Sequence, residues 1–206
     1  MVIDVPKLCC VVVLLPCWFS INMALADPPQ PQYSDAITLH VAQGVGQGLE
    51  TIPEHIILGH ITWEAAYFTA ITWSKVIASP ADSAWTHGYE VNVLQHRGLQ
   101  HNTEVAVAYD VRTGNLNLAG LQVNLAFGVG LSYALGTPSY EDGSKDEPLR
   151  RYRWQLFLPI ELEWSRFDQS NFSWVTRIHH RSGVYGLIAP KGVGSNFIST
   201  GLRYYF

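Results

Sequence analysis

The tripeptide His180-Arg181-Ser182 contains two side chains that could perform nucleophilic chemistry. Residues two apart in a β-strand share a face and lie ~6.6 Å apart along the backbone, so side-chain rotation brings an imidazole and a hydroxyl within reach of one hydrogen bond. A base beside a hydroxyl activates it for attack on an ester. In a chain with 8 histidines a His-x-Ser tripeptide easily arises by chance, so its place in the fold must decide whether it is a site.

Other candidate groups give weaker signals. His179 and His180 are adjacent, so in a regular strand they face opposite sides and cannot bind one metal ion together. Gly128 and Gly130 lack the following helix that a nucleotide-binding loop requires. We therefore predict neither a metal site nor a cofactor.

The composition restricts the folds that could position His180 and Ser182. Asp, Glu, Lys and Arg make up 15% of the 206 residues, against roughly 25% in an ordinary soluble domain. With 13 basic and 17 acidic residues, the chain has no cationic surface for phosphates, and no nucleic-acid partner is expected. After residue 26 no apolar run reaches the ~20 residues of a membrane-spanning helix. A soluble β-sandwich and a membrane β-barrel remain.

Residues 1–26 are typical of a secretory signal peptide. Lys7 precedes an apolar stretch, and Ala24 to Ala26 offer a small-residue cleavage site. The alternative is a short membrane anchor. All three cysteines lie in this segment, so we expect a mature chain without disulfides. The Pro-rich residues 27–35 are expected to form a periplasmic lead-in, and residues 36–206 the outer-membrane barrel domain.

Hydrophobicity alternates with period two through the mature chain, most clearly over residues 121–133. There one parity is large and apolar, whereas the other is small or polar. A sandwich core would bury the bulky parity, but a narrow barrel has small residues in its lumen. Eight such segments predict an all-β fold, an eight-stranded antiparallel up-and-down transmembrane β-barrel. They are residues 37–45, 63–73, 85–93, 105–111, 121–133, 152–164, 174–182 and 196–206.

Several local features refine this barrel. Trp63 and Trp73 could mark its two aromatic girdles. Pro159 lacks a backbone donor, so a bulge is expected there. Residues 46–61 could contain a helical turn, and the polar residues 137–148 resemble an extracellular loop.

Charged residues on the inward parity predict an ion-pair network in the lumen. Arg177, His179 and Arg181 would face Glu161 and Glu163 of the neighbouring strand. Because unpaired charges in a narrow lumen are costly, we interpret this network as structural and assign it no catalysis.

The last strand and the orientation of the chain point to the outer membrane. Ile198, Thr200, Leu202, Tyr204 and Phe206 share the outward parity, and this pattern resembles the terminal strand that the barrel-assembly machinery of the outer membrane reads. If both termini are periplasmic, Ser182 lies near the outer end of the seventh strand, at the level of the leaflet that contains lipid A. A polar pair facing acyl chains argues for a function.

These residues resemble the lipid A 3-O-deacylases, the PagL family of outer-membrane barrels. The resemblance is carried by RIHHRSGVYGL (residues 177–187) and SNFISTGLRYYF (residues 195–206). It implies that Ser182 is the nucleophile and His180 the general base, and that an ester-linked acyl chain of lipid A, within lipopolysaccharide, is hydrolysed without a metal or cofactor.

The chain departs from that family at two positions. The family has a Glu about a dozen residues after the serine, but residues 183–206 contain no Asp or Glu. Asn196, on the outward parity of the next strand, is our substitute for orienting His180. The family has Asn directly after the serine, where this chain has Gly183, whose backbone N–H could serve as oxyanion donor.

Two alternatives to a lipid A esterase remain open. One is a catalytically inactive small outer-membrane barrel with a structural or interaction role. The other is a periplasmic lipocalin-like carrier, which would be recovered without detergent.

Overall fold

The computed structural model describes residues 34–79, 85–118, 120–141, 152–166 and 171–206. The expected signal peptide, almost all of the lead-in, and residues 142–148 of the expected loop lie outside the described residues. No helix among the described residues is long and apolar enough to cross a membrane.

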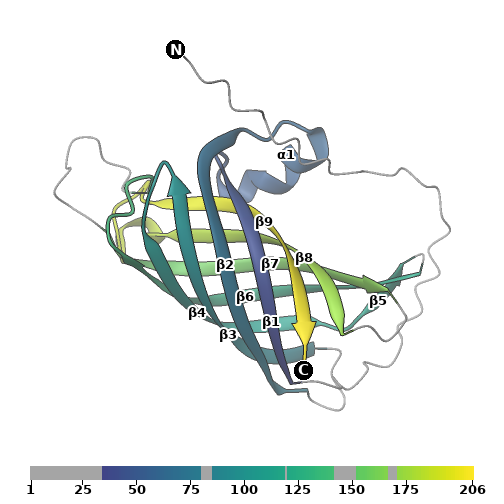
Figure 1. Ribbon diagram of the computed structural model, residues 1–206. Coiled ribbons are helices and arrows are strands. Elements are labelled where there is room, and N and C mark those ends of the chain that lie inside the picture. Colours follow the sequence, from purple (N-terminus) through teal and green to yellow (C-terminus); the bar gives the residue numbers. More distant parts are fainter. Residues whose placement is uncertain (1–33, 80–84, 119, 142–151, 167–170) are drawn as a thin grey trace.

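Eight long strands of the described chain form a closed antiparallel barrel (Figure 1). Each pairs with its neighbours in the sequence, and the last strand pairs with the first to close the cylinder. A further short strand, β5 (Leu116–Leu118), pairs with β6 alone. The predicted eight-stranded up-and-down barrel is confirmed. Its strands are β1 (Asp35–Val45), β2 (Trp63–Ala78), β3 (Trp85–Gly98), β4 (Thr103–Thr113), β6 (Leu121–Leu135), β7 (Trp154–Arg166), β8 (Phe172–Ser182) and β9 (Gly194–Tyr205).

We name the two ends of the barrel the α1 end, after the helix α1 (Ile52–Leu58), and the terminus end. At the α1 end, β1 ends at Val45, β8 ends at Ser182 and β9 begins at Gly194. At the terminus end, β1 begins at Asp35 and β9 ends at Tyr205.

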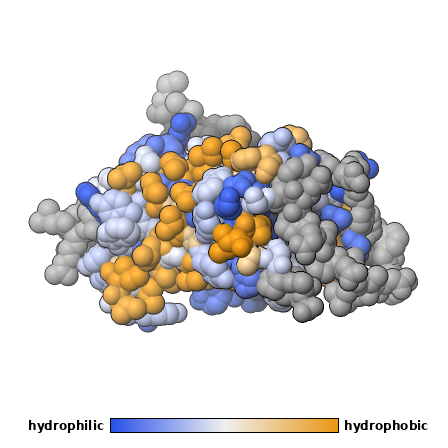
Figure 2. All heavy atoms as spheres, turned by 90° about the horizontal axis from the view of Figure 1, so that it is seen from below, coloured by the Kyte–Doolittle hydropathy of each residue, from blue (hydrophilic) through white to orange (hydrophobic). Residues whose placement is uncertain are grey.

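The outer wall of the barrel is apolar, as the alternation predicts. On β6, Leu125, Phe127, Val129 and Leu131 are exposed, whereas Ser132 on the opposite parity is buried. Apolar residues spread over the side of the molecule seen in Figure 2. Because apolar side chains fully exposed to water would be unfavourable over so large an area, this wall requires an apolar surrounding.

Aromatic side chains flank this wall at both ends. At the α1 end, Trp63, Tyr67, Tyr133 and Trp154 stand on the outward parity, and the rings of Tyr133 and Trp154 are 4.8 Å apart. At the terminus end, Trp164 stacks on Trp174 at 6.3 Å. Trp63 and Trp73 lie at opposite ends of the wall, as expected of residues that mark two girdles.

The described part of the lumen at the terminus end contains a network of buried ion pairs. Arg177 pairs with Glu161 at 2.6 Å and with Glu90 at 2.7 Å, and Arg203 pairs with Glu161 at 2.7 Å and Glu163 at 2.5 Å. The predicted contact between Arg177 and Glu161 is confirmed. A carrier needs an open bore for its ligand, so this packed ionic interior argues against the lipocalin-like alternative.

Two of the predicted lumen partners were wrong. Arg181 and His179 do not reach Glu161 or Glu163; they pair with Glu104, and Arg181 also pairs with Glu141. The reason is their position along β8. Every two residues advance the strand by ~6.6 Å, so His179 and Arg181 lie closer to the α1 end than Arg177 and are too far from Glu161 and Glu163.

The bulge expected at Pro159 is also absent from the described strands. Pairing between β6 and β7 keeps one register on both sides of Pro159, from Phe127 with Ile160 to Gly130 with Phe157. Gly128 makes room for the ring, since a Cβ there would lie 2.6 Å from Pro159 Cγ. A missing side chain on the neighbouring strand therefore accommodates the proline without an extra residue.

The segment between β1 and β2 folds back over the α1 end of the barrel (Figure 1). It contains a short 3₁₀ helix, η1 (Leu49–Thr51), followed by α1 (Ile52–Leu58), which confirms the helical turn expected in residues 46–61. Pro53 lies in the first helical turn, and α1 ends at Gly59 in the left-handed conformation, with φ of 69°. These are common start and stop signals of a helix.

Candidate active site

Neighbouring strands bring three of the predicted site residues together at the α1 end. In the β8–β9 register, His180 lies opposite Asn196, and Ser182 lies opposite Gly194. His180 and Ser182 are both partly exposed on the outward face of β8. The side chains therefore stand on the outer wall and not in the lumen.

A chain of hydrogen bonds orients the His180 ring. Asn196 Nδ2 donates to the carbonyl oxygen of Gln47 at 2.8 Å, which directs Asn196 Oδ1 toward the ring. His180 Nδ1 lies 2.6 Å from that Oδ1. Because an amide oxygen only accepts, Nδ1 must carry the proton, and in the neutral ring Nε2 keeps its lone pair. This is the tautomer that a general base needs.

Ser182 is the last residue of β8, and its hydroxyl is held by the turn that follows. Ser182 Oγ accepts a hydrogen bond from the backbone N–H of Val184 at 3.1 Å. Within the described residues, Ser182 and His180 share a face but have no hydrogen bond to each other. The proposed chemistry would require the Ser182 side chain to turn toward Nε2, and catalytic contacts are often loose before substrate binds.

The turn after Ser182 has an unusual backbone. Val184 and Tyr185 adopt φ values of 53° and 50°, a left-handed conformation that is a genuine outlier for a β-branched residue such as valine. Such strained residues occur preferentially at functional sites. In this turn the strain directs the Val184 N–H to the Ser182 hydroxyl.

Gly183 has a packing role that explains its identity. A Cβ on Gly183 would lie 2.4 Å from the carbonyl oxygen of Ala189, so only glycine fits. Its N–H, the expected oxyanion donor, donates to the carbonyl of Val193 at 3.1 Å. In this conformation the N–H is engaged, and Val184 carries the backbone donor that faces Ser182 Oγ.

The wall around the site is aliphatic. On the β7 side, Leu156 lies opposite Ser182 and Leu158 lies opposite His180. Trp154, a girdle residue, is two positions beyond Leu156 toward the α1 end. Ser182 therefore lies just inside the aromatic girdle, at the edge of the apolar wall.

Lumen residues support the strand end that carries Ser182. Arg181 is buried and donates to Glu141, to Ser132 Oγ at 2.6 Å and to the Arg153 carbonyl at 3.0 Å. The Glu141 carbonyl in turn accepts the N–H of Gly194, the residue opposite Ser182, at 3.2 Å. These bonds hold the ends of β8 and β9 in place from inside.

Sequence reasoning missed two residues of the β1–β2 segment. The Gln47 carbonyl anchors Asn196, and Glu50 places an exposed carboxylate in the same segment. Gln47 and Asn196 are 149 residues apart, so no local pattern could reveal their contact.

One group of possible metal ligands lies in the described part of the lumen. Ligand atoms of His96, Glu104 and Glu141 are within 4.8 Å of one another. His96 donates within this group to Glu104 at 2.9 Å, and Arg181 already places a positive charge against both carboxylates. We therefore assign these residues to the lumen network.

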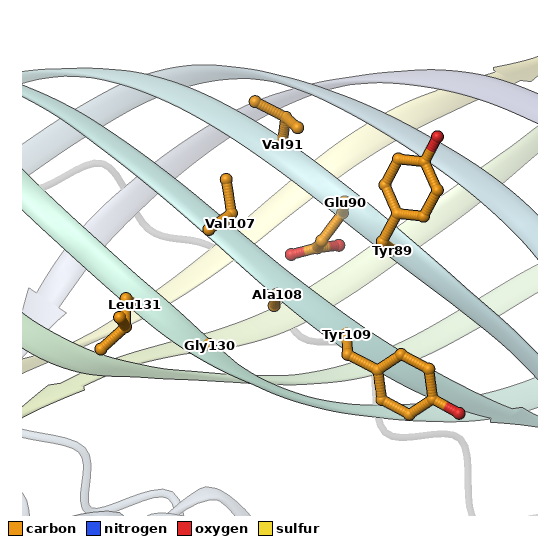
Figure 3. Close-up of a pocket in the computed structure, with 8 residues that line it drawn as sticks. All are labelled: Tyr89, Glu90, Val91, Val107, Ala108, Tyr109, Gly130 and Leu131. Atoms are coloured by element: carbon orange, nitrogen blue, oxygen red, sulfur yellow. The ribbon is translucent and has the colours of Figure 1, made fainter.

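A hollow on the outer wall lies across β3, β4 and β6, on the far side of the barrel from β8 in strand order. Val91, Val107 and Leu131 form a row across these strands, with Tyr89 and Tyr109 to one side (Figure 3). Its volume is about 370 Å³. Its outward side chains are aliphatic or tyrosine, so it offers no activated nucleophile.

No protein-family model matches the chain, and no curated protein matches it. The fold places it in the class of eight-stranded antiparallel β-barrels. The outer membrane enzyme PagL has this fold, with a TM-score of 0.55 and 11% identity over 82% of this chain and 99% of that chain. Neisserial surface protein A has a TM-score of 0.48 and 10% identity, over 84% of this chain and 97% of that chain. The N-terminal barrel of Pseudomonas aeruginosa OprF has a TM-score of 0.47 and 8% identity, over 84% of this chain and 98% of that chain. At 11% identity the similarity to PagL shows a common fold alone.

Proposed function

We propose that this chain is an outer-membrane esterase that removes an ester-linked acyl chain from lipid A. The observation that carries the proposal is a hydrogen-bonded polar group on an apolar outer wall, formed by His180 and Asn196 beside Ser182. Polar side chains that face hydrocarbon are costly and therefore usually functional. The barrel of PagL, described as an outer membrane enzyme, has the same architecture and supports the proposal.

The proposed location follows from the two girdles and the apolar wall. In this scheme residues 1–26 direct export, residues 27–35 lie in the periplasm, and residues 36–206 insert as the barrel domain. The barrel-assembly machinery would recognise the last strand, which ends with Tyr204 and Phe206 on the outward parity. With the terminus end in the periplasm, Ser182 faces the leaflet of lipid A and lipopolysaccharide.

The proposed reaction is a two-step hydrolysis by an acyl-enzyme. Ser182 Oγ attacks the ester carbonyl carbon while its proton passes to His180 Nε2. The ester C–O bond then breaks, and the sugar oxygen takes that proton and leaves as an alcohol. Water then attacks the acyl carbon and gives a proton to His180 Nε2, the bond between the acyl carbon and Ser182 Oγ breaks, and Oγ takes that proton back as the free fatty acid departs.

Two groups assist the charged states of this reaction. Asn196 Oδ1 accepts a hydrogen bond from His180 Nδ1–H and keeps the ring oriented. The tetrahedral oxyanion needs backbone donors, and the Val184 N–H is already directed at the Ser182 side chain. Gly183 N–H can contribute once its bond to Val193 opens.

Lipid A mass spectrometry tests this function directly. Expression of the chain in a Gram-negative host with unmodified lipid A should shorten lipid A by one acyl chain. Ser182→Ala should reduce the rate by at least on the order of 10³-fold, because it removes the nucleophile. Thr176→Ala is the matched control, since Thr176 is an exposed hydroxyl on the same face of β8.

The control variant should retain the activity of the unmodified chain. Unchanged lipid A, in cells where heat-modifiable gel mobility shows a folded barrel, would overturn the esterase proposal. It would favour the second candidate, a non-enzymatic barrel. The specific observations in favour of that candidate are the separate hydrogen bonds of Ser182 and His180 and the engaged N–H of Gly183.

A further inference from the structure

The aromatic girdle at the α1 end has a gap above the proposed site. Trp63, Tyr67, Tyr133 and Trp154 supply it on β2, β6 and β7. At the same end of β8 and β9, the outward positions are Ser182, Gly194 and Asn196. Nothing on these strands therefore occupies the interfacial level where tyrosine and tryptophan are favoured.

Two segments that border this gap carry the three most exposed large apolar side chains of the described residues, Tyr185, Leu187 and Ile57. In the turn after β8, Tyr185 is 89% exposed and Leu187 is 82% exposed. In α1, Ile57 is 75% exposed and Leu58 is 56% exposed. We refer to these four side chains as the apolar lip.

Both segments of the apolar lip are tied to the site by hydrogen bonds. The turn after β8 holds Ser182 Oγ through the Val184 N–H. The segment that leads into α1 holds Asn196 through the Gln47 carbonyl. Each segment that carries a part of the lip is therefore joined by a hydrogen bond to one polar residue of the site.

The turn holds its apolar side chains outward by its own backbone. The N–H groups of Ile188 and Ala189 both donate to the Gly183 carbonyl at 3.0 Å, and Leu187 N–H donates to the Val184 carbonyl at 3.0 Å. Together with the positive φ of Tyr185, these bonds keep Tyr185 and Leu187 from folding onto the protein. A rigid turn that exposes two large apolar groups to water would be unfavourable, so these groups need a partner.

We propose that the apolar lip inserts among the lipid acyl chains of the outer leaflet and holds a substrate acyl chain beside Ser182. This inference rests on the outer-membrane location proposed above. The lip adjoins the aliphatic wall at Leu156 and Leu158, which face Ser182 and His180. Hydrocarbon that covers that wall extends to the lip without interruption.

The exposed charge in the β8–β9 connection fits a lipid surface. Lys191 is exposed in the same β8–β9 connection, four residues after Leu187. A lysine beside interfacial aromatic and aliphatic side chains can direct its ammonium to anionic headgroups while the apolar groups enter the acyl region. A lipid therefore satisfies both kinds of side chain in this connection.

Quenching of single fluorophores tests the lip in the full barrel. Cysteine is introduced at one position at a time by Tyr185→Cys or Ile57→Cys in a protein that begins at Asp27, where the sequence has no cysteine. Each variant is labelled and inserted into phosphatidylcholine vesicles that contain a nitroxide on the acyl chain. Leu39→Cys, on the apolar wall, is the embedded control, and His101→Cys, exposed on another connection at the α1 end, is the aqueous control.

Labels at positions 185 and 57 should be quenched by the nitroxide lipid as strongly as at position 39, and by iodide several-fold less than at position 101. Iodide quenching equal to that at position 101 would overturn the inference. Protection from both quenchers that disappears when the protein is diluted into excess lipid would also overturn it, because a second copy would then cover the lip. The same measurements in a Ser182→Ala background do not depend on hydrolysis. A failure of the esterase proposal can therefore be distinguished from a failure of the lip to insert into the membrane.

Discussion

Two regions of the outer wall differ in shape and in chemistry. Across β3, β4 and β6 the wall is hollowed by about 370 Å³, but the outward residues that line the hollow are apolar or tyrosine. Near the α1 end of β8 and β9 the wall carries His180, Asn196 and Ser182, joined to neighbouring segments by hydrogen bonds. Concavity and chemical capability are thus on opposite sides of the barrel.

The hollow adjoins a point of close strand packing. A Cβ on Gly130 would lie 1.8 Å from the Val107 carbonyl, so β4 and β6 approach more closely than any side chain at that position would allow. The backbone of Gly130 lines the hollow between the outward side chains of Val107 and Leu131. The proposed function does not require a hollow, because the bilayer itself would bring the substrate acyl chain to His180 and Ser182 on the exposed wall.

The largest loss of activity is expected when Asn196 of the proposed site is replaced. Asn196→Leu should lower the rate of acyl-chain release by on the order of 10² to 10⁴-fold, because the His180 ring loses its orientation and its tautomer. The rate is read from lipid A spectra in cells that contain equal amounts of folded barrel. Gln43→Leu is the control, since Gln43 is another amide at the α1 end and anchors the Glu64 carbonyl at 3.0 Å.

Asn196→Asp sharpens the same test. Its carboxylate can accept the Nδ1 proton, but its second oxygen faces the Gln47 carbonyl that Asn196 now binds. The rate should therefore lie above that of Asn196→Leu. Equal activity of Asn196→Leu and the unmodified chain would show that the His180–Asn196 contact is merely structural.

In the region of the hollow, a substitution of Gly130 is expected to lower the stability of the barrel. Gly130→Ala should destabilise the barrel by about 3 kcal/mol or prevent its assembly, since the added methyl group collides with backbone and the strands must separate. Urea titration in detergent micelles, followed by gel mobility, measures the change. Gly46→Ala is the control, because its Cβ would meet only the flexible end of Glu64, at 3.0 Å.

A barrel of normal stability with Gly130→Ala would show that β4 and β6 are not in such close contact. If instead the variant folds less stably but its remaining folded fraction keeps full hydrolytic activity, the hollow has a packing role only. That outcome would support placing the chemistry on β8 and β9.

Period-two patterning predicted most of the barrel, because the direction of each side chain is a local property of a strand. It placed His180 and Ser182 on the outward face and Arg177 in the lumen, and the structure confirms all three positions. It could not supply the partners of His179 and Arg181, because Glu104 and Glu141 come from distant strands and connections. It also could not anticipate that the Gly183 N–H is bonded to Val193, since this depends on how the turn closes.

The smallest expected effect on the hydrolysis rate comes from removing the negative charge of Glu50 in the β1–β2 segment. Glu50 is exposed in the segment whose Gln47 carbonyl holds Asn196, so we expect its negative charge to favour the imidazolium form of His180 weakly. Glu50→Gln should reduce the hydrolysis rate by about twofold to threefold at low ionic strength, because the imidazolium formed in the reaction loses a favourable but weak interaction. Glu54→Gln, an exposed acid in α1, is the matched control.

Salt separates this electrostatic contribution from a structural one. At 0.15 M ionic strength the screening length is about 8 Å, so added salt should bring the rates of the unmodified chain and Glu50→Gln together. A deficit that persists at high salt would mean that Glu50 supports the fold of η1. Equal hydrolysis rates for Glu50→Gln and Glu54→Gln at low salt would mean that the Glu50 carboxylate does not contribute. The chemical difference between the site and the hollow would then depend only on His180, Ser182 and Asn196.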